Sequence, residues 1–440
     1  MGSYWNSSLR RYGLLLFAAA VAGQSSPSCK PIPGDDHWPS VETWEALNET
    51  ISGRLIATVP VGSTCELGKY VSYSINVEGP DDVVAGIEFA KENDVRLVIK
   101  NTGHDYLGKS TGKGGLALWT HNLKDIEVIE AYESDYYTGP ALKLGAGVQG
   151  WEAYTAASDR GYMVVGGTLY GLSADNVLEW EVVTAEGVHL VATPSENSDL
   201  YWALSGGGGG TFGIVLSMTT RLHEDTSIGG AHLQFDDSVI GHDAYWEAIE
   251  AFHSLLPPIL AQDTSLLYSV HNNSFSIFSL TAAGKSSTEV IELLQPLLDE
   301  LDARKVPFAI QIDQAPDSST TFHVQPANPR AVLSDPEANA AVTRALREGT
   351  ASDDFFFACQ ALDMSRNASV AANAVLPAWR EAASHCIVVG QWDYSAVAVA
   401  QGRMQAMQDA LVEVITPSLV AATPDFTETL VRALLDIETL

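Results

Sequence analysis

A strand–helix–strand pattern that runs directly into a glycine-containing loop is the feature that most constrains this chain. Residues 70–77 alternate like a β-strand, and Pro80 with Asp81 opens a helix, because proline fixes φ and a carboxylate favours the first amides. Apolar residues then recur at helical spacing, and residues 95–99 form a buried strand. The pattern predicts an α/β unit whose second strand leads into a loop at residues 101–108.

The remaining pattern divides into two halves of different character. The first half predicts strands at 116–119, 126–129, 141–144, 163–165, 177–184, 188–192 and 214–220, with helices at 151–160 and 200–204. The second half predicts helices at 243–256, 288–304, 337–347 and 396–414, separated by strands at 265–270, 276–280 and 387–391. Residues 24–68 are turn-rich. We expect a boundary near residues 225–230, in line with the two or three domains typical of 440 residues.

Charge excludes two classes of partner. The chain carries 24 Lys and Arg against 55 Asp and Glu, a formal net charge of −31. Nucleic acid and anionic membrane surfaces both require clustered basic side chains. The sequence therefore predicts neither partner.

The N-terminus has the pattern of a secretory signal peptide. Arg10 and Arg11 precede an apolar stretch at 13–23, and small residues follow it. The stretch is shorter than the ~20 residues that a membrane span needs. We expect cleavage after a signal at residues 1–23, secretion, and no membrane contact afterwards; the alternative is a buried N-terminal helix. Sequons for glycosylation begin at Asn48, Asn272 and Asn367.

The four cysteines match no zinc-binding spacing, and no metal site is expected. In a secreted chain Cys29 can pair with Cys65, and Cys359 with Cys386. The alternative is four buried thiols.

Two nucleotide-binding patterns occur, and their contexts argue against both. Residues 103–110 fit the P-loop expression, but residues 111–115 lead into another strand, so the phosphate-binding helix is missing. Residues 145–150 fit the Rossmann expression between a strand and a helix. The next strand ends in Gly166 and Gly167 without an acid for a ribose, which favours a tight packing turn.

The loop at residues 101–108 still needs a reason for its glycines. Such a loop brings backbone amides close to an anion without a helix, and a pyrophosphate suits it. His104 lies inside this loop, beside Asp105. If this loop stood alone, a turn histidine with a local hydrogen bond would be the preferred interpretation of His104.

Several further motifs join this loop. They are Gly53-Arg-Leu-Ile56, Leu97-Val-Ile-Lys-Asn-Thr-Gly-His104-Asp-Tyr-Leu-Gly108, Leu118-Trp-Thr-His121, Gly145-Ala-Gly147, Tyr170-Gly-Leu-Ser-Ala-Asp-Asn-Val-Leu-Glu-Trp180, and residues 197–213 with their five consecutive glycines. On these residues the chain resembles the FAD-linked oxidoreductases related to berberine bridge enzyme, in the vanillyl-alcohol oxidase superfamily, and looks most like secreted fungal members.

The resemblance implies an α+β fold. A PCMH-type FAD-binding domain of two α/β subdomains would cover residues 69–227, after a signal at 1–23 and an N-terminal segment at 24–68. A substrate domain at 228–440, shortened at its C-terminus, would hold an antiparallel sheet covered by helices.

The resemblance also implies the cofactor site. His104 aligns with the histidine that bonds covalently to the flavin 8α-methyl group, and the surrounding loop would hold the pyrophosphate. The implied FAD-binding residues are Thr102, Gly103, His104, Asp105, Tyr106, Leu107, Gly108, Ser110 and Gly171.

The implied activity is FAD-dependent oxidation of a small molecule, namely an alcohol, a sugar or a biosynthetic intermediate, with molecular oxygen as acceptor. No motif fixes the catalytic base, for which Tyr268, Asp393 and Tyr394 are candidates. Family members carry a cysteine-containing, glycine-rich segment after Gly167 and a longer C-terminal segment, and this chain lacks both. The alternative is therefore a catalytically degenerate, shortened paralogue without functional FAD.

Overall fold

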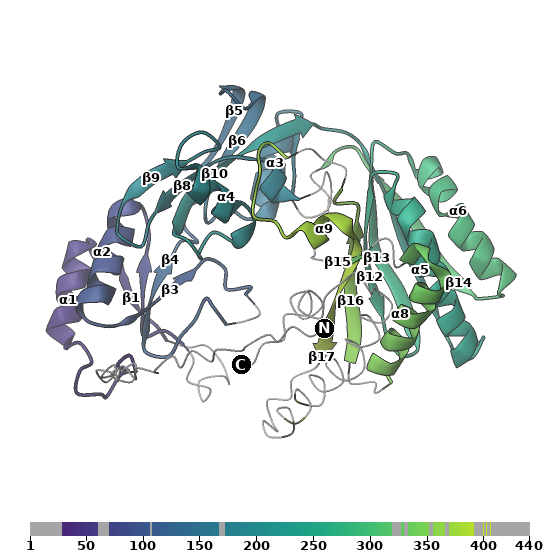
Figure 1. The fold of residues 1–440 in the computed structure, drawn as a ribbon, viewed down its shortest axis with the longest axis horizontal. Helices are drawn as coiled ribbons and strands as arrows, with labels where there is room; N and C mark the ends of the chain where they lie inside the picture. The colour runs from purple at the N-terminus through teal and green to yellow at the C-terminus, as the bar shows by residue number, and fades with distance from the viewer. Residues whose placement is uncertain are drawn as a thin grey trace, which may run out of the picture.

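The computed structural model describes residues 29–59, 70–105, 108–166, 172–318, 327–329, 333–351, 355–365 and 369–390, together with residues 399, 402 and 405. Within these ranges the strands form sheets of four, six and seven strands. Figure 1 shows the first two sheets on one side of the molecule and the seven-stranded sheet on the other. The mixture of helices with largely antiparallel sheets confirms the predicted α+β class.

The four-stranded sheet contains the strand–helix–strand unit that the sequence predicts. Its order is β1 (Leu55–Ala57), β2 (Tyr73–Asn76), β4 (Gly115–Trp119) and β3 (Arg96–Lys100), with β2, β4 and β3 parallel. Helix α2 (Pro80–Glu92) begins with Pro80 and covers this sheet. A Cβ atom at Gly86 would lie 2.5 Å from Leu118 Cδ2, so the glycine permits close packing of helix on sheet.

Helix α1 (Val41–Thr50) corrects the prediction that residues 24–68 are turn-rich throughout. The Ser40 hydroxyl accepts a hydrogen bond from the Thr43 amide, which caps the helix. Trp44 and Leu47 are buried on one face, and the Trp44 ring stacks on Tyr73 with centroids 4.1 Å apart. The prolines before the helix obscured this short apolar stripe.

The six-stranded sheet is antiparallel and carries its helices on one face. Its order is β5 (Ile126–Glu133), β6 (Thr138–Gly145), β10 (Ile214–Glu224), β8 (Val177–Val183) and β9 (His189–Ala192), and β7 (Tyr162–Val164) also pairs with β10. Leu142 and Leu144 pack against α3 (Gly150–Ser158), and Trp180 packs beside α4 (Ser198–Gly207).

The seven-stranded sheet is antiparallel and begins when the chain leaves β10. Its order is β14 (Phe308–Ala315), β11 (Ile228–Asp236), β13 (Ser274–Ala283), β12 (Thr264–Val270), β16 (Phe355–Leu362), β17 (Ala382–Gly390) and β15 (Ala327–Pro329). Helices α5 (His242–Leu260), α6 (Ser287–Ala303) and α8 (Pro336–Gly349) cover one face, and α9 (Pro377–Glu381) precedes β17.

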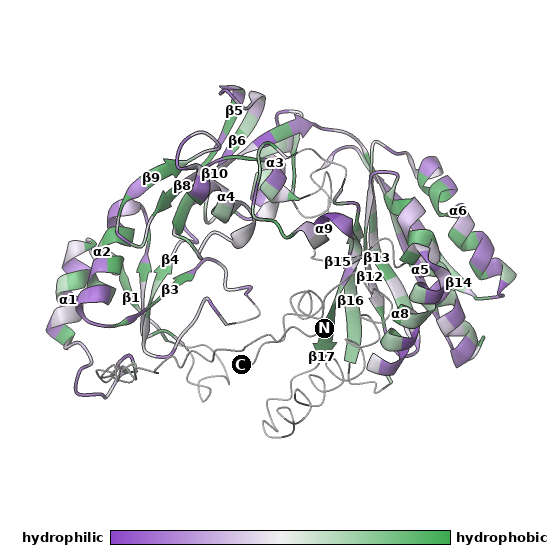
Figure 2. Ribbon diagram, in the orientation of Figure 1, coloured by the Kyte–Doolittle hydropathy of each residue, from purple (hydrophilic) through white to green (hydrophobic). Residues whose placement is uncertain are grey.

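Figure 1 shows α5, α6 and α8 on the face of this sheet that is turned away from the first two sheets. Figure 2 shows mostly hydrophobic residues in β4 but alternating hydrophobic and hydrophilic residues along α6, as expected for a helix with one buried stripe. The other face of the seven-stranded sheet, which we call the open face because α5, α6 and α8 do not cover it, therefore points toward the first two sheets.

The sequence analysis did not predict strands β11, β14 and β16. Gly229 and Gly230 in β11 suggest a turn, yet a Cβ atom at Gly229 would lie 2.5 Å from Val290 Cγ2, so this glycine lets α6 approach the strand. The predicted helix at 396–414 falls almost wholly outside the described residues. The predicted domain limits remain predictions.

Two searches over the described residues gave negative results. They contain no helix long and apolar enough to cross a bilayer. They also contain no group of three or more His, Cys, Asp or Glu side chains that could hold a metal ion.

Candidate functional site

The loop between β3 and β4 contains most of the residues predicted to bind FAD. Thr102, Gly103, His104, Asp105 and Gly108 are exposed, and Ser110 is half-buried. The backbone has φ of +87° at Gly103 and +73° at Gly108, a region that favours glycine. Tyr106, Leu107 and Gly171 lie outside the described residues.

A hydrogen bond within the loop joins its two sides. The Ser110 amide donates to Asp105 Oδ2 over 3.2 Å. Residues 108–114 then lead into β4 without a helix, which agrees with rejection of the P-loop pattern. The loop thus combines exposed backbone, two left-handed glycines and an exposed histidine, and these features fit a pyrophosphate and a nearby flavin ring.

Asn101 fixes the base of this loop. The Asn101 Nδ2 atom donates to the Ala146 carbonyl over 2.6 Å. The backbone carbonyl of Asn101 accepts from Trp119 Nε1 over 3.0 Å. The Asn101 Oδ1 atom lies 3.2 Å from His121 Nδ1. One side chain therefore ties the loop to the end of β4 and to the turn after β6.

The turn after β6 is the one that fits the Rossmann expression, and its glycines serve packing. A Cβ atom at Gly145 would lie 2.4 Å from the Leu123 carbonyl oxygen. A carboxylate of the chain itself caps the start of α3, because Glu152 accepts from the amide of the N-cap residue Gln149 over 2.6 Å. The hydrogen bonds from Lys124 and the Gln149 amide lower the pKa of Glu152. The interpretation of this segment as a tight packing turn is confirmed.

The run of five glycines, at residues 206–210, borders the same loop. A Cβ atom at Gly210 would lie 3.6 Å from Ile99 Cδ1, at the end of β3. At the other end, Gly206 has φ of +130°, and a Cβ atom there would lie 2.4 Å from the Val375 amide nitrogen. The glycines thus lie between the candidate flavin loop and the connection from β16 to β17.

Sequence analysis assigned no role to two buried polar residues beside the predicted site. Asp175 and Asn176 follow Gly171 closely, and both are fully buried. Asn176 Oδ1 accepts from Arg221 Nε over 2.5 Å and lies 3.0 Å from His223 Nε2. Burial, helped by Arg221, lowers the pKa of His223 to about 4. The available signal was the Asp-Asn pair itself, which lies within the motif at residues 170–180.

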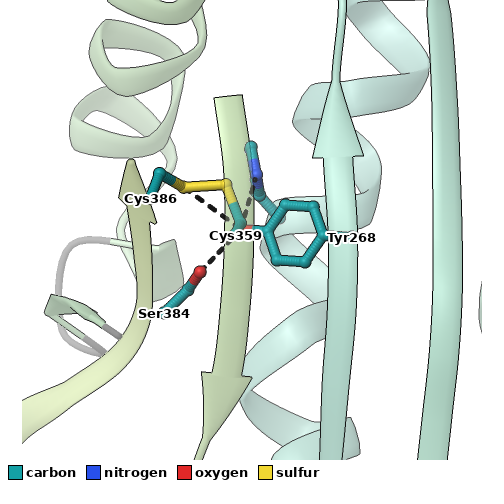
Figure 3. Close-up of a disulfide and its surroundings, with 5 residues drawn as sticks. Tyr268, Cys359, Ser384 and Cys386 are labelled. Carbon is teal, nitrogen blue, oxygen red and sulfur yellow. Dashed lines mark hydrogen bonds between the residues drawn. A yellow bond between two sulfur atoms is a disulfide. The ribbon is translucent and has the colours of Figure 1, made fainter. Parts of the chain in front are cut away.

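Tyr268, the one described candidate for the catalytic base, lies on the helix-covered face. Its hydroxyl lies 2.7 Å from Ser384 Oγ and 3.4 Å from His253 Nε2, a residue of α5. Figure 3 shows Tyr268 and Ser384 beside the disulfide between Cys359 and Cys386. Tyr268 is 1% exposed, and burial raises its pKa. It is therefore not a base on the open face; Asp393 and Tyr394 lie outside the described residues.

The disulfide confirms one predicted cysteine pair. Cys359 and Cys386 face each other directly in β16 and β17, and both are buried. Cys29 is exposed, and its predicted partner Cys65 lies outside the described residues, so that pairing stays a prediction.

The open face carries polar and aromatic side chains that the sequence did not single out. Because side chains alternate along a strand, Gln360 and His385 lie opposite the disulfide face and are paired in register. Burial lowers the pKa of His385 to about 2, and Trp379 packs edge-on against it with centroids 5.8 Å apart. Phe278 lies where a bulge interrupts β13, and is 52% exposed.

Comparisons with known proteins agree with this geometry. The pattern of the FAD binding domain family matches residues 72–166. The VAO-type flavoprotein oxidase VAO615 of Thermothelomyces thermophilus is 41% identical, over 91% of this chain and 85% of the relative. The bifunctional decalin synthase calF of Penicillium decumbens is 39% identical, over 93% of this chain and 87% of the relative.

Solved structures give the same answer. The VAO-type flavoprotein MtVAO615 from Myceliophthora thermophila C1 superposes with a TM-score of 0.81 at 40% identity, over 90% of this chain and 88% of that one. Berberine bridge enzyme from Eschscholzia californica superposes with a TM-score of 0.61 at 13% identity, over 88% of this chain and 85% of that one, and shows likeness of fold alone.

The fold and the glycine-rich loop therefore define an FAD-dependent oxidoreductase. The chain belongs to the VAO-type family of FAD-linked oxidoreductases, as its resemblance to berberine bridge enzyme relatives predicted. The alignment with VAO615 spans 496 positions, more than the 440 residues of this chain, so that relative contains segments that this chain does not.

Proposed function

We propose that this enzyme oxidises a small organic molecule, such as an alcohol, a sugar or a biosynthetic intermediate, with FAD attached to His104 and molecular oxygen as the acceptor. The observation that carries the proposal is the exposed His104 in a loop with two left-handed glycines, in a chain 41% identical to a VAO-type oxidase. The chemistry that FAD supplies when bound is transfer of a hydride from substrate carbon and of two electrons to oxygen, which leaves as hydrogen peroxide.

The described residues support the assignment of roles within the loop. Backbone amides of the exposed residues 102–105 and 108 would bind the pyrophosphate, and the Asp105–Ser110 hydrogen bond would hold the loop in the binding shape. His104 would form a covalent bond to the flavin through a ring nitrogen. Asn101 would keep the loop aligned with the turn after β6.

The open face of the seven-stranded sheet supports a substrate site opposite the loop. Phe278 presents an exposed aromatic ring there, and the Phe356 ring stacks on His271 with centroids 4.4 Å apart. These aromatic side chains suit a molecule with a planar apolar part.

We also propose secretion, since the predicted signal peptide precedes the described residues. The disulfide between Cys359 and Cys386 suits an oxidising compartment. The sequon at Asn272 lies in the turn between β12 and β13, where Asn272 is half-buried and Asn273 is exposed.

The first experiment is acid precipitation of the purified protein, followed by visible absorption spectra of pellet and supernatant. Yellow colour in the pellet supports covalent FAD. Colour in the supernatant supports FAD binding but contradicts the covalent bond. Folded protein without colour in either fraction would contradict the proposed function and favour the degenerate paralogue.

A further inference from the structure

An ion pair with a fully buried carboxylate joins Arg380 to Asp175, which is 205 positions earlier and follows the predicted FAD-binding residue Gly171 by four positions. Arg380 donates from both terminal nitrogens to Asp175, over 2.6 Å each, so the contact is bidentate. Asn373 Nδ2 donates to Asp175 Oδ1 over 2.7 Å, and Asn373 Oδ1 accepts from Arg380 over 3.1 Å. The Asp175 side chain is fully buried, and its hydrogen bonds raise the pKa of Arg380.

Backbone contacts extend this attachment along the chain. The Val370 amide donates to the Asp175 carbonyl over 2.9 Å. The Ala374 amide lies 2.9 Å from the Ser205 carbonyl and 3.1 Å from that of Trp202, both in α4. Because Gly206 has no Cβ atom, the backbone at Val375 can pack closely against it; a Cβ atom on Gly206 would clash with the Val375 amide nitrogen. We call residues 369–380 the strap.

The path of the strap is longer than its two ends require. Strands β16 and β17 are neighbours in the sheet, so a short hairpin could connect them. The connection instead reaches α4 and Asp175 before α9 returns it to β17. The strands at its two ends carry Gln360 and His385 on the open face.

Charge explains why this attachment is specific. A buried carboxylate is costly unless a cation and hydrogen bonds compensate it, and a bidentate guanidinium does so at a fixed geometry. Asp175 also lies four residues from Gly171, a predicted flavin contact. The pair therefore links the segment next to the flavin to the strands of the open face.

We propose that Arg380, acting through Asp175, is a positioning residue that fixes the open face relative to the flavin. This proposal rests on the proposed function, because it supposes that flavin occupies the candidate loop. It assigns Arg380 no contact with substrate or cofactor.

The test compares Arg380→Met and Arg380→Lys with a matched control, Arg304→Met. Arg304 forms ion pairs with Glu300 and Glu247 among the outer helices, remote from the strap. Two readouts are needed: hydrogen exchange at the Val370 and Ala374 amides, and the rate at which sulfite bleaches the flavin absorption. Sulfite is the probe because it reacts at the flavin without a specific substrate.

We expect Arg380→Met to raise amide exchange in the strap at least about tenfold, because local opening becomes easier. We expect the sulfite rate to change by about tenfold, since small displacements at a reacting centre have effects of this size. Arg380→Lys should recover part of both, and Arg304→Met should match the wild type. If Arg380→Met folds poorly, Asn373→Ala is the second variant. It removes the Asn373 hydrogen bonds to Asp175 and Arg380 but keeps both members of the ion pair.

Faster exchange with an unchanged sulfite rate would overturn the positioning role and leave a purely structural contact. Unchanged exchange would overturn the attachment itself. A folded wild type without flavin would contradict the proposed function instead, while the exchange comparison would still report on the strap.

Discussion

A Cβ atom at Gly147 would lie 2.1 Å from the carbonyl oxygen of His121. The two backbones thus touch where the first two sheets meet, beside the Asn101 side chain that fixes the candidate flavin loop. The glycine that the Rossmann expression would assign to a nucleotide serves this contact between segments of the chain.

Substitution of Gly147→Ala should therefore destabilise the protein and reduce its flavin content. We expect a loss of about 3 kcal/mol in the free energy of unfolding, because the neighbouring atom is backbone and can move little. Denaturant unfolding and visible absorption measure the two effects. Gly79→Ala is the control, since a Cβ atom there meets nothing within 4 Å. Equal stability of the two variants would contradict this account.

Substitution of His104→Ala should abolish the covalent bond to FAD. Because the loop amides remain, we expect some FAD to bind and to appear in the supernatant after acid precipitation. His37→Ala, at another exposed histidine, should retain its colour in the pellet. Colour retained in the pellet by His104→Ala would refute the assignment.

Removal of the disulfide should destabilise the seven-stranded sheet. The bond closes a separation of 27 residues, for which constraint of the unfolded chain predicts about 2–4 kcal/mol. The double variant Cys359→Ala with Cys386→Ala tests this by denaturant unfolding. A double variant as stable as the wild type would show that sheet packing alone suffices.

Buried His253 should make stability fall in mild acid. Burial lowers its pKa from 6.5 to about 4, so the unfolded chain binds a proton between these values while the native protein does not. The free energy of unfolding should then decrease by about 1.4 kcal/mol per pH unit as the pH falls from about 6.5 to about 4, on account of this residue.

His253→Gln should remove that part of the pH dependence. The measurement is denaturant unfolding of both proteins at pH 7, 6 and 5, with His37→Gln as an exposed control that keeps the wild-type slope. Parallel slopes for wild type and His253→Gln would mean that His253 is protonated in the native state.

Local sequence determined the elements around the cofactor loop. Pro80 and the apolar spacing after it set α2, and the buried run before Asn101 set β3, because each depends on near neighbours and on backbone preferences. The glycines and His104 then identified the loop. Their place among family motifs indicated FAD, which the comparisons support.

Tertiary structure alone decided which faces and partners these elements have. Tyr268 lies in a predicted strand and Gln360 in one that the sequence analysis missed. Only the position of α5 and α8 places the first under helices and the second on the open face. The pairing of Asp175 with Arg380 crosses 205 residues. Contacts at such separation depend on how whole sheets pack, and no local preference of either residue specifies them.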